Sequence, residues 1–377
     1  MGTKLVPVLL VALLPLLCVC GGGGGGGSGD PEPPGPEAVL QGSYYLYGYT
    51  LTYPDAIGPG TEPDLPSCSW GVATADGAGS MDLVMQGNRD GEFDSEPGEG
   101  TLSYVVPSPG VLELPPPVGP GIPYLGGHVS PSGRFASVAK IVADEQPGIL
   151  VFTRRGGTYS DASLDGAYVI CGFYTHPVPI ALFGGVSISS PGHGDATVAA
   201  NVAGTPSGSG PVSLSYSISG NGDTSLDIGS LTDMHGGTVA GGDVVVVGGA
   251  AADGLPPALF AFVRGSTDRT LADFDGDYAI VGYRYDVSAD AYLSATGVLT
   301  ADGVGGYTTT LTVTDGETLW EDVAGGGTYD ISAAGVLLLT NTLGDIYTGA
   351  LSPDGASAVA SGAINVGHDP AIYFLHR

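Results

Sequence analysis

A short acidic segment of the chain carries the residue types best suited to hold a hard cation. Its five oxygen-bearing side chains stand at alternate positions: Asn88, Asp90, Glu92, Asp94 and Glu96. Calcium prefers clustered carboxylate and amide oxygens of this kind. The segment lacks the spacing of an EF-hand loop, and a solvated acidic loop is the alternative interpretation. The sequence therefore predicts one candidate calcium site and no other cofactor.

No catalytic constellation stands out in the sequence. It contains no G-x-S-x-G nucleophile elbow, no H-E-x-x-H, no paired C-x-x-C and no Walker loop. None of the six histidines is paired at metal-ligand spacing. His193 and Asp195 share a turn, and His128 and His235 stand at corresponding places in two parts of the chain. We therefore expect a protein that is not an enzyme.

The charge balance excludes some partners. The chain has 39 Asp and Glu against 10 Lys and Arg, for a formal net charge of −29. Nucleic-acid binding needs a basic surface that neutralises phosphates. We expect no nucleic-acid partner and no electrostatic docking on anionic lipid, and we interpret the acidity first as a source of solubility.

The first 20 residues have the pattern of an export signal. Lys4 precedes an apolar run over residues 5–17, which is too short to span a bilayer comfortably. The run ends in Leu17-Cys18-Val19-Cys20, and seven glycines follow. This pattern resembles a bacterial lipoprotein signal, which implies acylation of Cys20, with Cys18 as the alternative, and anchoring in a lipid membrane.

A cleaved secretory signal and a retained transmembrane anchor are the other interpretations of this segment. All three place the mature protein outside the cytoplasm, in the outer membrane or periplasm, at the cell surface or secreted. Residues 21–39 are rich in Gly and Pro and are typical of a tether. Beyond the signal only Cys68 and Cys171 remain, and they predict no disulfide framework.

The rest of the chain is built from one unit repeated three times. The pattern G-x-Y-x-x-x-G-aromatic occurs at 42–49, 166–173 and 276–283. Each unit ends in an aromatic strand and an arginine. We place the units at these boundaries: 40–155, 156–264 and 265–377.

Hydrophobic periodicity predicts strands throughout these units. Val, Ile and Thr alternate with polar or small residues over short runs, and Asp-Gly, Pro-Ser-Gly and Asn-Gly separate the runs. Turn signals recur about every 8–12 residues, as in all-β sandwiches and barrels. The expected fold is all-β, with three tandem antiparallel meander barrels. A six-bladed propeller with two blades per unit is the main alternative, and a sandwich is the third.

The ends of each unit resemble the lipocalin and calycin group. In that group Gly-x-aromatic opens the first strand, and a basic residue on the last strand packs across the ring. The matching residues are Gly42, Tyr44 and Arg154 (or Arg155), then Gly166, Tyr168 and Arg264, then Gly276, Tyr278 and Arg377. The resemblance implies a closed barrel and a cation–π contact, with Tyr in place of the usual Trp.

These observations favour an exported, lipid-anchored, non-enzymatic binding or interaction protein of the cell envelope. A small molecule, a glycan or an envelope protein would be its ligand. The alternatives are a structural envelope spacer and a hydrolase on a propeller. Tyrosines 44, 45, 47, 49 and 53 either line a barrel mouth or simply fill the fold. A binding protein requires an apolar cavity inside at least one unit, whereas solid interiors would favour the spacer.

Overall fold

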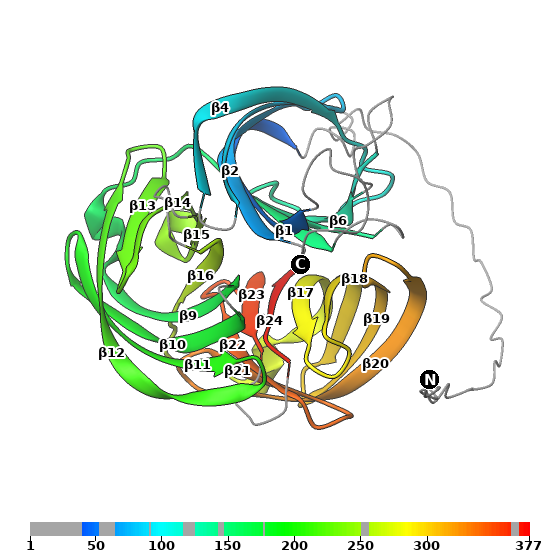
Figure 1. Cartoon of the computed structure of the whole chain (residues 1–377). Helices are drawn as coiled ribbons and strands as arrows, with labels where there is room; N and C mark the ends of the chain where they lie inside the picture. The colour runs from blue at the N-terminus through cyan, green and yellow to red at the C-terminus, as the bar shows by residue number, and fades with distance from the viewer. Residues whose placement is uncertain are drawn as a thin grey trace, which may run out of the picture. The chain divides into compact units, whose positions relative to one another are not determined.

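The computed structural model describes residues 40–52, 65–89, 92–115, 125–141, 147–175, 178–249, 256–362 and 369–377. They belong to one compact unit that spans Pro34–Arg377. Its strands form three antiparallel sheets of eight strands each (Figure 1). The described helical structure consists of short 3-10 turns, which include η2 (Asp161–Leu164) and η4 (Leu271–Asp273). The prediction of an all-β fold is confirmed.

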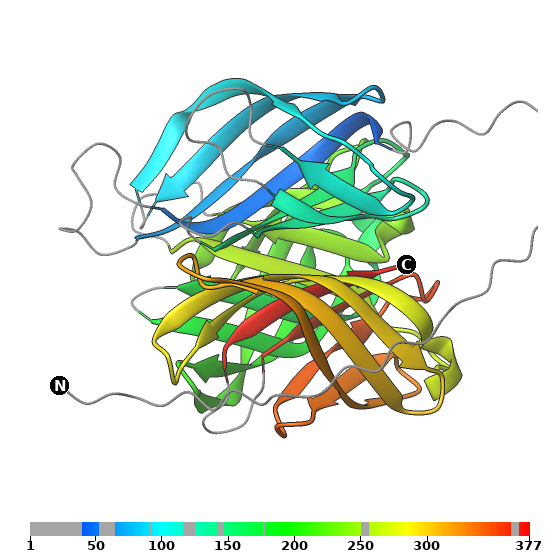
Figure 2. The ribbon, with the colours of Figure 1, turned by 90° about the vertical axis from the view of Figure 1, so that its right-hand side faces the viewer.

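The first sheet occupies the first repeat. Its strands are β1 (Gln41–Thr52), β2 (Leu65–Asp76), β3 (Ser80–Arg89), β4 (Glu92–Ser103), β5 (Val111–Leu114), β6 (Leu125–Val129), β7 (Phe135–Lys140) and β8 (Gly148–Arg154). They are ordered β4-β3-β2-β1-β8-β7-β6-β5. Figure 2 shows the strands of this sheet (blue to teal) crossing obliquely.

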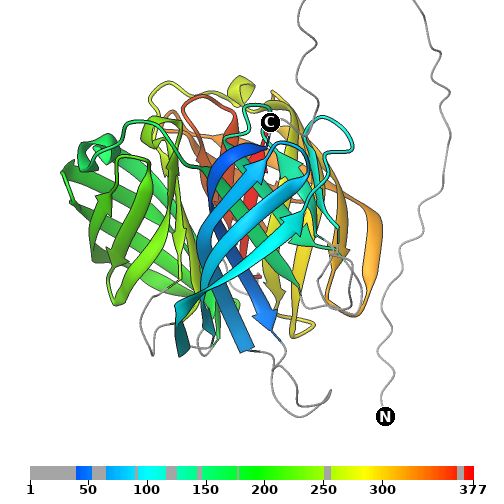
Figure 3. The same cartoon turned by 90° about the horizontal axis from the view of Figure 1, so that it is seen from above.

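The second sheet closes into a barrel. Its strands are β9 (Gly166–Thr175), β10 (Pro179–Ser190), β11 (His193–Val202), β12 (Thr205–Ile218), β13 (Asp223–Ile228), β14 (Leu231–Val239), β15 (Val244–Gly248) and β16 (Ala258–Arg264). Consecutive strands pair, and β16 returns to β9. In Figure 3 these strands (green) curve into a closed wall.

The third sheet is also a closed barrel. Its strands are β17 (Asp275–Asp286), β18 (Ala291–Asp302), β19 (Gly306–Thr314), β20 (Leu319–Ile331), β21 (Val336–Asn341), β22 (Ile346–Leu351), β23 (Ser357–Ser361) and β24 (Ala371–His376). The pairing of β17 with β24 closes it.

The expectation of three closed barrels is wrong for the first repeat. In its described residues the edge strands β4 and β5 do not pair; Val105, which follows β4, forms only an isolated bridge with Glu113 of β5. Strand β5 has four residues, and Pro107 and Pro109 precede it. Proline has no N–H to give to a ladder, so a long pairing cannot form there. The propeller is also wrong, because each sheet has eight strands rather than the four of a blade.

Strand alternation explains the repeated signature. Along β17, Tyr278 and Ile280 face the interior of the third barrel, whereas Val281 and Tyr283 face outward. The same alternation holds in β1 and β9. The signature tyrosine therefore points into its own sheet, and the final aromatic points out of it.

The second glycine of the signature makes room for a cross-strand neighbour. Gly282 pairs with Tyr373, and a Cβ at Gly282 would lie 2.2 Å from the Cδ1 atom of Tyr373. Phe260 covers Gly172 in the same way, at 2.4 Å. Any larger residue at these positions would collide with the ring that crosses it.

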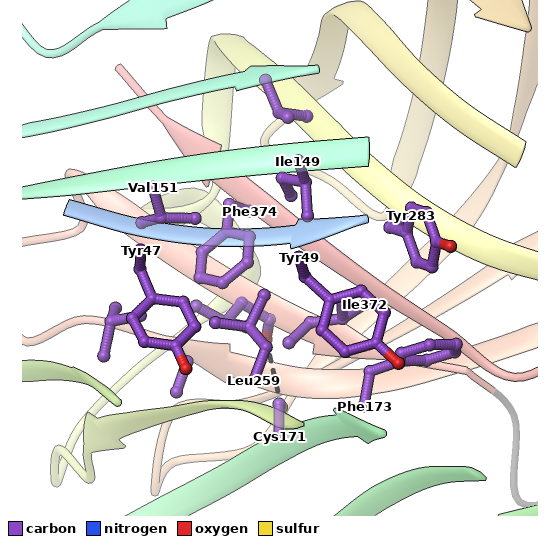
Figure 4. Close-up of a cluster of buried hydrophobic side chains, with 14 of the residues drawn as sticks. Tyr47, Tyr49, Ile149, Val151, Cys171, Phe173, Leu259, Tyr283, Ile372 and Phe374 are labelled. Atoms are coloured by element: carbon purple, nitrogen blue, oxygen red, sulfur yellow. Dashed lines mark hydrogen bonds between the residues drawn. The ribbon is translucent and has the colours of Figure 1, made fainter. Parts of the chain in front are cut away.

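The three sheets share a central junction, which we define by the outward side chains of β1, β9, β17 and the last strand of each repeat. Its members include Tyr47, Tyr49, Ile149, Val151, Cys171, Phe173, Leu259, Tyr283, Ile372 and Phe374 (Figure 4). The final signature aromatics meet there edge-on. Ring centroids are 5.5 Å apart for Tyr49 and Phe173, 5.4 Å for Tyr49 and Tyr283, and 5.3 Å for Phe173 and Tyr283. This packing buries one continuous apolar core.

Buried hydrogen bonds also cross between the repeats. The hydroxyl of Tyr47 donates to the carbonyl of Ala258, at 3.0 Å. The Cys171 thiol, in the second barrel, donates to the carbonyl of Thr348 in the third, at 3.7 Å. The hydroxyl of Ser294 donates to the carbonyl of Lys140, at 2.5 Å. Each repeat is thus bonded to the other two.

Candidate binding cavity in the third barrel

The third barrel contains a cavity of about 350 Å³. This volume lies in the range of small-molecule sites, about 300–1,000 Å³. Apolar and aromatic side chains from most strands of the barrel line it: Ile280, Leu299, Tyr307, Leu311, Val323, Leu339, Tyr347 and Tyr373. Its polar lining includes Arg284, Thr309 and Asn341.

A run of small residues in β20 creates much of this space. Ala324, Gly325 and Gly326 line the cavity. They pair with Thr308–Thr310 of β19, and just beyond them the register of β19 with β20 shifts between Leu311 and Val313. A strand with almost no side chains over several positions cannot fill the barrel, and the bulge alters its course.

Three tyrosines give the cavity its aromatic character. The rings of Tyr347 and Tyr373 meet edge-on, with centroids 5.2 Å apart. Burial raises the pKa of Tyr307 to about 12, and burial raises the pKa values of Tyr347 and Tyr373 as well. All three hydroxyls stay protonated at neutral pH, so they can donate or accept hydrogen bonds but cannot act as bases.

Arg284 brings the cavity its fixed positive charge. Burial lowers the pKa of Arg284, but the neighbouring tyrosines and the carboxylates of Asp369 and Asp286 outweigh this effect and raise it overall. Both carboxylates lie 3.7 Å from the guanidinium. The cation is therefore already balanced, and it offers a ligand hydrogen-bond donors rather than an excess of charge.

The turn between β21 and β22 forms one rim of the cavity. The Asn341 side-chain oxygen accepts hydrogen bonds from the backbone N–H groups of Leu343 and Asp345, both at 2.9 Å. The amide of Asn341 donates to the Asp345 carboxylate at 2.8 Å. Leu343, 86% exposed, is held beside the cavity by this turn. The rim thus adds an apolar surface to the entrance.

The lining residues suit binding rather than catalysis. They include no histidine, cysteine, aspartate or glutamate. Tyrosine rings and leucines would enclose an apolar body, while Arg284, Asn341 and Thr309 would orient one or two polar groups on it. A compact, largely apolar ligand with a hydrogen-bond acceptor fits this arrangement.

The residues of the predicted calcium site do not form a described metal centre. Asn88 is buried, whereas Glu96 is exposed. Asp90 and the side chains of Glu92 and Asp94 lie outside the described residues. Among the residues that the structure describes, no group of three His, Cys, Asp or Glu side chains could hold a metal. Calcium binding at 88–96 stays a prediction.

In the second and third repeats the signature arginine lies across the signature tyrosine. The guanidinium of Arg264 is 4.9 Å from the ring centroid of Tyr168, and that of Arg377 is 4.7 Å from that of Tyr278. In the first repeat, burial raises the pKa of Tyr44 and the charge of Arg154 partly offsets this. Gly42, Gly166 and Gly276 have φ of +102°, +133° and +86°. Glycine therefore suits this opening position in all three repeats.

Each signature tyrosine also ties the start of its repeat to a later turn. The hydroxyls of Tyr44 and Tyr168 donate to the carbonyls of Gly133 and Gly242, both at 2.9 Å. Tyr278 donates to Gly355 at 3.1 Å. These hydroxyls thus join the first strand of each repeat to one of its later turns.

Two histidines that stand at corresponding places in two repeats, His128 and His235, lie where repeats meet. His128 faces His376, with ring centroids 6.2 Å apart, and His235 stacks on Trp70 at 5.9 Å. His193 and Asp195 are both exposed on β11. Cys68 and Cys171 are both buried, and burial raises the pKa of Cys171 to about 12. Cys18 and Cys20 lie outside the described residues.

The first tyrosine cluster divides between two surroundings. Tyr44 packs inside the first sheet, whereas Tyr47 and Tyr49 belong to the central junction and Tyr45 packs against it. Tyr53 lies outside the described residues. The cavity instead uses tyrosines of the third repeat, which sequence reasoning did not single out. The Ala-Gly-Gly-Gly run at 324–327 was the signal that could have found it.

In the described residues, no helix has the length and apolar character needed to cross a membrane.

Comparison with known proteins finds no family model and no curated protein that matches. Among solved structures, transferrin binding protein B from serogroup B Neisseria meningitidis is 10% identical, with 90% of this chain and 77% of that chain covered and a TM-score of 0.26. A mutant of the same protein from Haemophilus parasuis is 11% identical (89% and 75% covered, TM-score 0.18). A Nostoc punctiforme protein of unknown function is 9% identical (91% and 98% covered, TM-score 0.19). At such TM-scores we draw nothing from these similarities.

Proposed function

We propose that this chain is an exported, non-enzymatic binding protein of the bacterial cell envelope, anchored by a lipid on Cys20. In this account its third barrel, of lipocalin-like form, holds a small, largely apolar ligand. The first sheet and the second barrel support this barrel through the central junction. The observation that carries the proposal is the aromatic cavity of about 350 Å³.

The cavity favours a binding function over that of an envelope spacer. A protein that only bridges distance gains nothing from empty space in a barrel, since unfilled apolar volume costs about 24 cal/mol per Å³. A ligand would recover those contacts. The aromatic walls and the balanced Arg284 point to a neutral molecule with a ring or branched apolar body and one acceptor group.

A probe titration tests the binding. We suggest N-phenyl-1-naphthylamine, a neutral aromatic dye that fluoresces in apolar surroundings. The full chain should bind it saturably. Replacing Thr309, which lines the cavity, by Trp should fill the space and reduce dye binding at least tenfold. Thr310 is the matched control, since it is the next residue of β19 and is exposed.

The outcomes of this titration are distinct. Loss of binding in Thr309→Trp, with binding kept in Thr310→Trp, supports the third-barrel site. Equal binding by both variants, or no saturable binding by the unaltered chain, contradicts it. The anchor is tested separately by the intact mass of the mature protein from a membrane fraction, which should start at an acylated Cys20. A soluble product that starts at a glycine would refute the anchor.

A further inference from the structure

A second pocket, of about 570 Å³, lies between the first sheet and the second barrel. It shares no lining residue with the third-barrel cavity. Its lining includes Arg134, Arg154 and Arg155, and none of its lining residues is acidic. The whole chain has only 10 Lys and Arg against 39 Asp and Glu. Three of these scarce cations therefore converge on one concave surface.

We propose that this pocket binds the phosphate monoester group of a polar molecule. Two of its three arginines carry a charge that no acidic group in the described residues balances, and they select a doubly charged anion. The Arg155 guanidinium donates to both carboxylate oxygens of Asp223, at 2.6 and 2.5 Å, so its charge is already balanced. Arg134 and Arg154 are exposed, and the described residues give neither of them an ion pair. Two uncompensated charges remain, and they match a phosphate dianion.

Strand pairing brings these two charges together. The backbone N–H of Arg154 donates to the carbonyl of Arg134 at 2.8 Å, where β8 runs beside the start of β7. Like charges on neighbouring strands destabilise a sheet. An anion between them would replace this repulsion with charge-assisted hydrogen bonds, and planar guanidinium groups suit phosphate oxygens.

The remaining wall leaves room for the molecule that carries the phosphate. Gly156 and Gly157 have φ of +115° and +128°, and a Cβ at Gly156 would meet nothing within 4 Å. The ring of Tyr159 packs over Gly157, 2.8 Å from where its Cβ would lie. Glycine and an aromatic ring form an open, flat surface, onto which a sugar or glycerol group fits. The pocket volume exceeds what inorganic phosphate alone needs.

Calorimetry on the full chain at low salt tests the site. Inorganic phosphate and glycerol phosphate serve as soluble probes, and vesicles of phosphatidylcholine with phosphatidic acid serve as the lipid probe. The variant is Arg134→Gln with Arg154→Gln. Lys140→Gln is the control that also removes a positive charge, because Lys140 is not among the residues that line this pocket. Thermal unfolding of each variant shows that it folds.

We expect saturable binding of glycerol phosphate or of the phosphatidic acid vesicles. The double variant should weaken this binding at least tenfold, and Lys140→Gln should leave it within twofold. Binding by the soluble probes identifies a free phosphate ester as the source, and binding by vesicles alone identifies a lipid headgroup. Added salt should weaken the binding of the soluble probes and of the vesicles alike. The proposal is overturned if none of the three probes binds saturably, or if the folded double variant binds as well as the unaltered chain.

Discussion

The rings of Tyr49 and Phe173 meet edge-on at 5.5 Å and 89°, although 124 residues (173 − 49) separate them. Both stand at the last position of the repeated signature, and the equivalent Tyr283 completes the contact. The signature therefore encodes more than the start of a sheet. It places one aromatic side chain of each repeat at the point where all three repeats pack together.

This contact predicts a large loss of stability when one ring is removed. Phe173 is fully buried, so Phe173→Ala should destabilise the folded protein by about 3–5 kcal/mol. Chemical denaturation measures this. Trp320→Ala removes a ring that is 42% exposed and should cost much less. Equal losses in the two variants would show that the central junction does not hold the repeats together.

The second signature glycine is predicted to be intolerant of any side chain. In Gly172→Ala the new Cβ would lie 2.4 Å from the Cδ1 atom of Phe260, and the overpacking should cost about 1–3 kcal/mol. Phe260→Leu should relieve part of this cost in the double variant. Gly185→Ala is the control, because a Cβ there meets nothing within 4 Å. Strictly additive losses for Gly172 and Phe260 would contradict this account.

Acid stability should depend on a buried histidine. Burial, with a smaller contribution from His128 beside it, lowers the pKa of His376 to about 3. Burial also lowers the pKa of His128, while Phe135 packs on His376 and carries no charge. The folded state keeps His376 neutral, whereas the unfolded chain takes up a proton below about pH 6.5. Its contribution is thus complete above pH 6.5 and is lost as pH falls.

The loss is about 1.4 kcal/mol per pH unit between the two pKa values. Denaturation at a series of pH values measures the slope. His376→Leu should flatten it below pH 6.5, and His193→Leu, at an exposed position, should leave it steep. A slope unchanged by His376→Leu would show that this histidine does not titrate as described.

Much of this architecture was predictable from the sequence. Alternation and turns such as Thr300-Ala-Asp-Gly303 predicted the strands, and the Gly-x-Tyr and arginine pairs predicted where each repeat begins and ends. These features are local, and each carries its own physical signal. The open edge between β4 and β5 could be predicted only in part. The prolines on either side of Ser108 indicate a break in the strand, but they do not show how many residues stay unpaired.

The sites were harder to predict, because they depend on contacts between distant residues. Arg284, Tyr347 and Tyr373 come together only when β17, β22 and β24 close the third barrel. Arg134 and Arg154 meet through one strand pair, and the overall acidity of the chain hides them. By contrast, a calcium site was predicted near Asp90 because its acidic residues are close together in the sequence.

The central claim is that a ligand enters the third barrel, and an NMR titration tests it most directly. The full chain, with isotope-labelled leucine and isoleucine methyl groups, is titrated with N-phenyl-1-naphthylamine. The account predicts saturable shifts at Ile280, Leu299, Leu311 and Leu339, which line the cavity. Ile170 and Leu226, which fill the second barrel, should stay unshifted. Shifts at Ile170 and Leu226 with none at the cavity residues, or no saturable shift at all, would contradict it.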